Sequence, residues 1–265
     1  MLVQQESPSP RKRKTGPIAA WLFILSYWAL TSFFGRVAST SQIPQVLTTS
    51  LLLSFIVSQL VEYVPILVFV FLLVWLSEKR ERNGGIRSLF SSVGWRRTGI
   101  KQSLKWSIVF LLLLAPIALL LSEIQSVLVG SASQLGSAAS KAVPTYYFLF
   151  VIISALCTAI TEETALRGYI LDRLMPAHPS TLRQSLNAVL ITSILMMSYH
   201  AVPYLNSYGF SLSITILSLA SVFVYSIFIS FAYVRSRVKN VSGPILFHFI
   251  LDAGVYIILL ASLLL

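Results

Sequence analysis

The chain has 265 residues, of which 56% are hydrophobic and only 11% charged, too few polar side chains to cover a water-soluble globule. The formal net charge of +11 does not point to nucleic acid, because the basic residues lie in short segments beside apolar runs and form no separate basic face. The composition therefore predicts an integral membrane protein, in contact with the lipid bilayer and with no nucleic-acid partner.

The chain begins with a polar segment and continues as a series of apolar runs. Residues 1–16, MLVQQESPSPRKRKTG, predict a disordered cytoplasmic tail, and residues 17–265 predict a single membrane-embedded helical domain. A transmembrane helix needs at least about 17 mostly apolar residues. Such runs lie at about 18–34, 46–76, 104–121, 145–161, 186–202, 211–233 and 243–264. The sequence thus predicts an all-α, polytopic transmembrane bundle of about seven spans.

The run at 46–76 is either one long helix or two segments broken near Pro65, which would give eight spans. Lys and Arg in short loops stay on the cytoplasmic side of a membrane. With one span at 46–76, only Arg36 and Lys141 fall on the opposite side from the basic tail and the basic 77–105 loop. Two spans would move that loop outside. We therefore predict seven spans in the cell membrane, with a cytoplasmic N-terminus and an external C-terminus.

Three charged residues follow the apolar run YYFLFVIISALC: Glu162, Glu163 and Arg167, in TAITEETALRGYI (158–170). A carboxylate near a helix centre costs about 2.5–3.5 kcal/mol on insertion, so these side chains should face the bundle interior or a wet cavity. Residues four apart share a helix face, which predicts a Glu163–Arg167 pair and leaves Glu162 about 100° around the helix. Gly168 allows a close helix approach or a local bend.

Two of the three histidines lie within predicted spans. His200 occurs in LMMSYHAVP, and His248 precedes Asp252 by four residues, so these two share a helix face. His178, between prolines in PAHPS, is expected to be a solvated turn residue. A Glu with a His can polarise a water and remove its proton, and a second His can stabilise the resulting oxyanion. The set suits hydrolysis of an amide.

The depths of these residues in the membrane do not obviously agree. Along a straight helix, Glu162 lies about 16 Å from Arg173, whereas His200 lies about 26 Å from Arg183. A tilted or broken helix, or a fifth helix that begins after residue 183, is needed to bring His200 level with Glu162.

The ordered segments EETALRG, MMSYH and HFILD resemble the three motifs of the CPBP family, which contains type II CAAX prenyl proteases and bacteriocin-processing or immunity proteins and is also called the Abi family. The family pattern is E-E-x-x-x-R, F-x-x-x-H and H-x-x-x-N or D on separate membrane helices. The resemblance covers about 145–264. It implies an intramembrane endopeptidase acting on a prenylated, leader or other membrane-associated peptide substrate.

The resemblance also implies a role for each motif residue. Glu162 and His200 would activate the water. Glu163 would pair with Arg167 as structural support. His248 with Asp252 would form the oxyanion side. The catalytic set implied by the resemblance is Glu162, His200, His248 and Asp252.

Two positions depart from the commonest family pattern. Met196 stands where an aromatic residue is usual, and Asp252 where many members carry Asn. An ionised carboxylate only accepts hydrogen bonds, so Asp252 is expected to orient His248 or help bind a cation. Family members have been discussed both as metal-dependent and as metal-independent enzymes. We favour activation by Glu and His without a cofactor; in the alternative, zinc would be held by Glu162, His200 and His248.

Two other functions remain open from the sequence. A non-catalytic immunity or scaffolding protein of the same family would keep the helices without turnover, although it would not need the complete set of motifs. A proton- or ion-coupled transporter would use buried carboxylates and histidines to relay charge, but it would favour two similar halves with broken spans, which the sequence lacks.

Overall fold

A computed structural model describes residues 22–23, 25–26, 29, 51–78, 86–129, 145–175, 182–207 and 212–264. The predicted tail at 1–16, most of the predicted span at 18–34, and His178 lie outside these residues. Within the described ranges every regular element is a helix, which confirms the predicted all-α class.

The helices follow the predicted apolar runs and extend beyond most of them. In chain order they are α3 (Leu51–Glu78), α4 (Ile86–Ser92), α5 (Ile100–Val129), α7 (Thr145–Glu163), the π-helix η1 (Thr164–Leu171), α8 (Asp172–Leu174), α9 (Leu182–Ser207), α10 (Leu212–Ser236) and α11 (Ser242–Leu264). Four described stretches are long and apolar enough to cross a membrane: Phe55–Leu76, Ile100–Gln125, Phe148–Leu174 and Leu212–Ser236. In α9, the shorter stretch Ser185–Ala201 is also apolar. The chain is therefore a helical membrane bundle.

The run predicted at 46–76 is a single helix from Leu51 onward. α3 continues through Pro65 for 28 residues, and α5 likewise continues through Pro116. Proline removes one backbone hydrogen bond, which a long helix packed against neighbours tolerates. The alternative of two segments broken near Pro65 is not what the structure shows.

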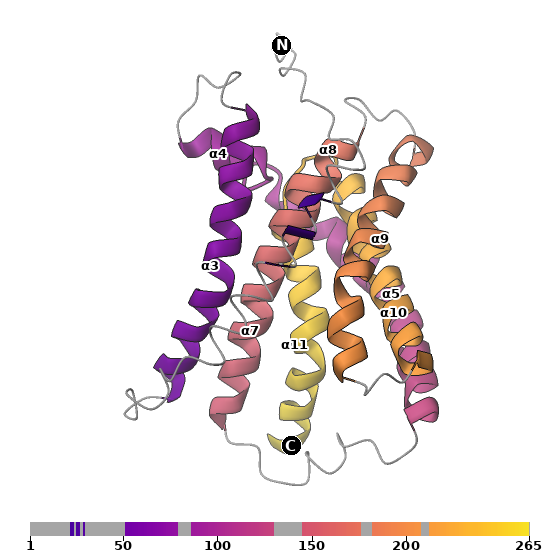
Figure 1. Cartoon of the computed structure of the whole chain (residues 1–265). Coiled ribbons are helices and arrows are strands. Elements are labelled where there is room, and N and C mark those ends of the chain that lie inside the picture. Colours follow the sequence, from indigo (N-terminus) through magenta and orange to yellow (C-terminus); the bar gives the residue numbers. More distant parts are fainter. Residues whose placement is uncertain are drawn as a thin grey trace.

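Basic side chains gather at one end of the bundle. The upper end in Figure 1 holds α4, α8 and the turn between α10 and α11, and the C-terminal end of α11 lies at the lower end. The described basic residues of the upper end are Arg87, Arg96, Arg97, Lys101, Lys105, Arg173, Arg183, Arg235, Arg237 and Lys239. None of the described helix ends on the lower side carries Lys or Arg. This asymmetry agrees with the predicted cytoplasmic side.

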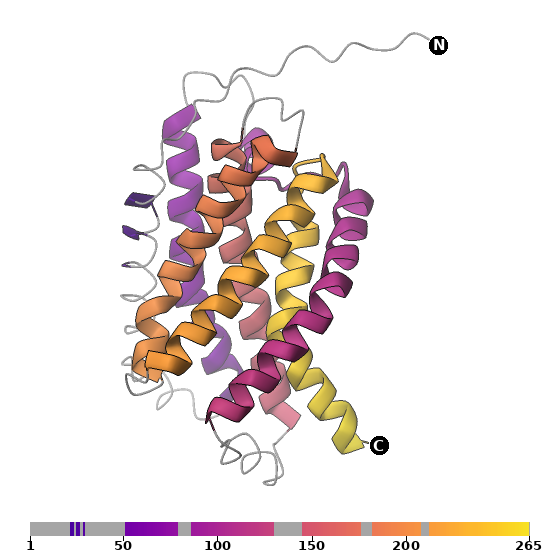
Figure 2. The same cartoon turned by 90° about the vertical axis from the view of Figure 1, so that its right-hand side faces the viewer.

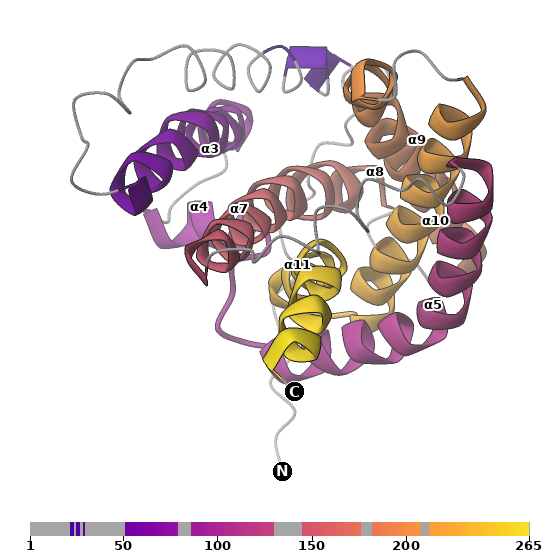
Figure 3. The same cartoon turned by 90° about the horizontal axis from the view of Figure 1, so that it is seen from below.

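The charged helix α7 is the most enclosed of the apolar spans. In the span Phe148–Leu174, 44% of the 18-residue apolar segment is buried inside the protein, against 33% or less of the corresponding segments in the other three spans. Seen along the bundle, α7 lies between α3 and α11, with α9 and α10 beyond its far end (Figure 3). Every residue of the following π-helix is buried. The carboxylates at the end of α7 are therefore kept away from lipid, as predicted.

The turn between α10 and α11 is tied to the start of α5 by Asn240. Its side-chain Nδ2 donates to the carbonyl oxygens of Arg96, at 2.6 Å, and Thr98, at 3.1 Å. Its Oδ1 accepts from the backbone N–H of Ser242, at 2.9 Å, and so satisfies the first backbone donor of α11. Asn240 therefore ties the start of α11 to the segment that precedes α5.

Gly168 allows the π-helix to lie directly against the backbone that follows α4. A Cβ atom at this position would overlap the carbonyl oxygen of Val93. Of the two roles predicted for this glycine, the structure supports the close approach.

Replacing Gly168 with alanine should destabilise the fold by about 1–3 kcal/mol, because the backbone of Val93 cannot move aside as a flexible side chain would. Thermal unfolding in detergent measures the change. Gly254→Ala is the matched control, since its new Cβ would meet only Ile250 Cγ2 at 3.8 Å, an ordinary contact. Equal unfolding midpoints for the two variants would contradict the tight contact at Gly168.

Candidate active site

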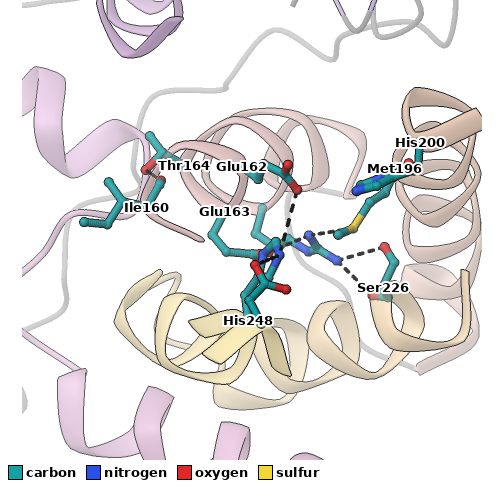
Figure 4. A network of polar contacts seen from close by, with 10 residues as sticks. Ile160, Glu162, Glu163, Thr164, Met196, His200, Ser226 and His248 are labelled. Carbon is teal, nitrogen blue, oxygen red and sulfur yellow. Dashed lines mark hydrogen bonds and ion pairs between the residues drawn. The ribbon is translucent and has the colours of Figure 1, made fainter. Parts of the chain in front are cut away.

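The residues that the sequence singled out meet inside the bundle from four helical elements. Glu162 and Glu163 end α7, Arg167 lies in η1, His200 in α9, and His248 and Asp252 in α11. Figure 4 shows Glu162 and Glu163 above His248, with His200 on the neighbouring helix. Glu163 and Arg167 are fully buried, Glu162 and His248 are 3% and 5% exposed, and Asp252 is the most open of the set. The structure thus brings together every site residue predicted from the sequence.

Glu163 and Arg167 form the predicted ion pair. Arg167 Nη1 donates to Glu163 Oε1 at 2.8 Å. The other arm of the guanidinium, Nη2, donates to the Oγ of Ser226 at 2.8 Å and to its carbonyl oxygen at 3.1 Å. Met196 Sδ lies 3.4 Å from Nη1. The position at which the family usually carries an aromatic thus contributes a sulfur contact to the arginine.

Glu163 has a second role that the sequence did not reveal. The Nδ1 atom of His248 lies 2.8 Å from Glu163 Oε1, the same oxygen that accepts from Arg167. Because a carboxylate oxygen accepts, Nδ1 carries the hydrogen and donates. Glu163 therefore orients the imidazole of His248 as well as neutralising Arg167. The two residues are 85 positions apart, so no local spacing could have indicated the contact.

The other ring nitrogen of His248 faces two carboxylates. Nε2 lies 3.3 Å from Asp252 Oδ2 and 4.0 Å from Glu162 Oε2. The contact with Asp252 confirms that these residues share a face of α11. His248 is thus fixed on one side by Glu163 and presents its other nitrogen to Glu162.

Glu162 has a buried Oε2 atom with which no described residue forms a hydrogen bond. The same holds for Glu163 Oε2, but the other oxygen of Glu163 accepts from Arg167 and from His248. The carboxylate of Glu162 lies within electrostatic range of His200, His248 and Asp252. A buried polar atom without a protein partner is costly unless water or a substrate group satisfies it. Glu162 therefore has the position expected of an acid or base that acts on a small polar molecule.

His200 approaches the site from α9. Its Nδ1 lies 2.8 Å from the carbonyl oxygen of Met196, which can only accept, so Nδ1 donates and the Nε2 of the neutral ring is left to accept. The rings of Tyr199 and Tyr204 flank it, with centroids at 4.8 and 5.6 Å. This environment restricts the rotation of the imidazole.

The difference in depth predicted for His200 is removed by tilt. α9 and α10, in orange in Figure 2, run obliquely across the bundle. His200, His248 and Asp252 consequently line one cavity of about 190 Å³. Of the three arrangements that the spacing allowed, a tilted helix is the one observed.

The same cavity is lined by polar residues that were not predicted. They are Gln125 in α5 and Ser218, Ser221 and Tyr225 in α10, and Gln125 Nε2 donates to Ser218 Oγ at 3.4 Å. A sequence signal existed for the serines. Ser218 and Ser221 lie three residues apart in an apolar helix and hence on one face.

The zinc alternative involves Glu162, His200 and His248. Among the described residues, no three His, Cys, Asp or Glu side chains are grouped so as to hold a metal ion. The bond between His248 Nδ1 and Glu163 leaves Nε2 as the nitrogen that would face such an ion. The mechanism proposed below uses groups of the protein and water, and a chelator tests the zinc alternative.

Comparison with known proteins relates part of the chain to a family model. Residues 144–254 match the sequence model of a family described as type II CAAX prenyl endopeptidase Rce1-like. Neither a curated protein nor a solved structure matches the chain significantly. The matched residues contain all three motifs on which the resemblance to the CPBP family was based.

Proposed function

Because residues 144–254 match the sequence model of the type II CAAX prenyl endopeptidase Rce1-like family, we propose that this membrane protein is an intramembrane endopeptidase. It hydrolyses a peptide bond of a membrane-associated substrate, such as a prenylated or leader peptide, in the cell membrane. The observation that carries the proposal is Glu162: a buried carboxylate without a donor on Oε2, 4.0 Å from His248 Nε2.

In the proposed reaction, Glu162 removes a proton from a water whose oxygen forms a bond to the substrate carbonyl carbon. His200 accepts a second hydrogen bond from that water at Nε2, since its Nδ1 is occupied by the Met196 carbonyl. The negative charge that develops on the substrate oxygen is stabilised by His248 Nε2–H. Protonated Glu162 then delivers its proton to the leaving amine as the carbon–nitrogen bond breaks.

The remaining residues prepare His248 for this role. Asp252 Oδ2 and Glu163 Oε1 contact opposite nitrogens of its ring, at 3.3 and 2.8 Å, and favour the doubly protonated imidazolium that can donate from Nε2. Arg167 prevents Glu163 from becoming an unpaired buried charge. Asp252 and Glu163 are thus positioning residues.

The proposal is tested by incubating the purified full chain in detergent with fluorogenic peptides: a prenylated C-terminal peptide, its unprenylated form and a leader peptide. We expect cleavage of at least one peptide, retained after treatment with a zinc chelator. Loss of cleavage with the chelator and its recovery with zinc would assign the water activation to a metal. Folded protein that cleaves none of the peptides would favour the immunity or scaffolding alternative.

A further inference from the structure

A second, larger cavity lies at the basic end of the bundle, outside the candidate active site. It has a volume of about 730 Å³ and is formed by α4 and the turn that precedes α5. Three arginines and two aromatic residues dominate its lining: Arg87, Arg96, Arg97, Phe90 and Trp95. None of them takes part in the proposed hydrolysis.

No described residue neutralises the charge of Arg87 or Arg97 in this cavity. Residues 86–106 contain five basic side chains and no acidic one. Arg87 and Arg97 are exposed, and neither forms an ion pair with a described residue. Arg96 is held in place, because its Nε donates to the carbonyl oxygen of Ser91 at 2.8 Å. The cavity therefore offers guanidinium groups to an anion.

Apolar side chains beside these arginines indicate where the ligand comes from. Ile86, Phe90 and Trp95 are 75%, 41% and 38% exposed. The first two belong to the short helix α4, and Trp95 follows it. Exposed aromatic and aliphatic residues together with arginine are typical of the membrane interface. The basic end is also the side predicted to face the cytoplasmic leaflet, where anionic lipids are enriched.

We propose that this cavity binds the phosphate-bearing headgroup of an anionic phospholipid. Guanidinium groups match phosphate oxygens in planar, paired hydrogen bonds, and several of them converge here. Phe90 and Trp95 would lie against the glycerol and upper acyl chain. The volume of about 730 Å³ is sufficient for a headgroup.

The cavity is joined directly to the π-helix that follows the two carboxylates. Trp95 Nε1 donates to Thr164 Oγ1 at 2.9 Å, immediately after Glu163 in the chain. The backbone of Val93 in the same segment touches Gly168. A lipid that orders this segment therefore also stabilises the π-helix. This inference does not depend on the proposed protease activity.

The test uses the full chain in neutral detergent, titrated with dioctanoyl phosphatidylglycerol while the thermal unfolding midpoint is recorded. We expect the midpoint to rise with lipid concentration. Arg87→Gln with Arg97→Gln should raise the half-saturating concentration roughly 30-fold, because these substitutions remove charge-assisted hydrogen bonds to the phosphate that lysines outside the cavity do not make. The matched control, Lys101→Gln with Lys105→Gln, removes the same charge outside the cavity and should respond like wild type.

Three results would overturn the proposal. Equal weakening by both pairs of substitutions would mean general attraction to a basic surface. An equal rise with inorganic phosphate or with dioctanoyl phosphatidylcholine would mean that the anionic lipid is not the ligand. If the variant with Arg87→Gln and Arg97→Gln does not fold, the variant with Arg87→Lys and Arg97→Lys is titrated instead. These lysines keep the charge but not the paired geometry, so unchanged affinity would exclude a guanidinium site.

Discussion

Replacing Glu162 with glutamine should reduce peptide hydrolysis by roughly 10²–10⁴-fold, because glutamine keeps the shape of the side chain but cannot take a proton from water. The thermal unfolding midpoint in detergent should stay the same or rise, since the amide removes a buried charge whose Oε2 no described residue satisfies. Turnover of the best peptide in the fluorogenic panel, measured beside the unfolding midpoint, separates catalysis from folding. Full activity in this variant would end the mechanism.

A double substitution tests whether Glu162 and His200 act together. If Glu162 and His200 act on one water, His200→Ala alone should cost about as much activity as Glu162→Gln, and the pair should cost little more. Multiplicative losses in the pair would mean that the two residues act independently. Ser198→Ala is a suitable control in the same helix as His200. Its hydroxyl donates to the carbonyl oxygen of Leu195 at 2.9 Å and it does not line the cavity, so the variant should retain most of the activity.

Replacing Arg167 with alanine should destabilise the protein by about 3–5 kcal/mol, because it leaves Glu163 buried without its cation. Ser226 would lose its donors at the same time. A strongly lowered thermal midpoint is the expected result. Arg183→Ala, which removes an exposed arginine from α9, should leave the midpoint nearly unchanged.

Glu163→Gln combined with Arg167→Ala should recover part of the lost stability, since it removes the unpaired charge. Recovery should be incomplete, because Glu163 also accepts from His248. A single Arg167→Ala variant with the stability of wild type would contradict the buried pair. Full recovery in the double variant would contradict the link between Glu163 and His248.

The local part of the site was predictable because helix geometry fixes which residues are neighbours. Spacings of four residues gave the pairs Glu163–Arg167 and His248–Asp252, and both are present. No rule of sequence spacing predicts contacts between different helices. The bonds from Arg167 to Ser226 and from His248 to Glu163 depend on how α10 and α11 pack.

In the fold, too, local features were predictable from the sequence and features that depend on packing were not. Composition and the length of the apolar runs predicted the helices, and the asymmetry of basic residues predicted one unbroken α3. The π-helix at Thr164–Leu171 was not predicted, because a regular α-helix was assumed from end to end. The π-helix makes contacts with another segment that local spacing does not indicate: Gly168 lies against Val93, and Trp95 donates to Thr164. The tilt that brings His200 level is likewise a property of packing.

The buried pair at the end of α7 has a consequence for biosynthesis. The partners of Arg167 and Glu163 in α10 and α11 lie 59 and 85 residues further along the chain. At about 5–20 residues per second, the ribosome completes them roughly 3–17 s after α7. During that interval α7 carries charges that lipid does not solvate, so it has to remain beside the translocon or another helix. Insertion of this helix is therefore completed only when the last hairpin of the nascent chain arrives.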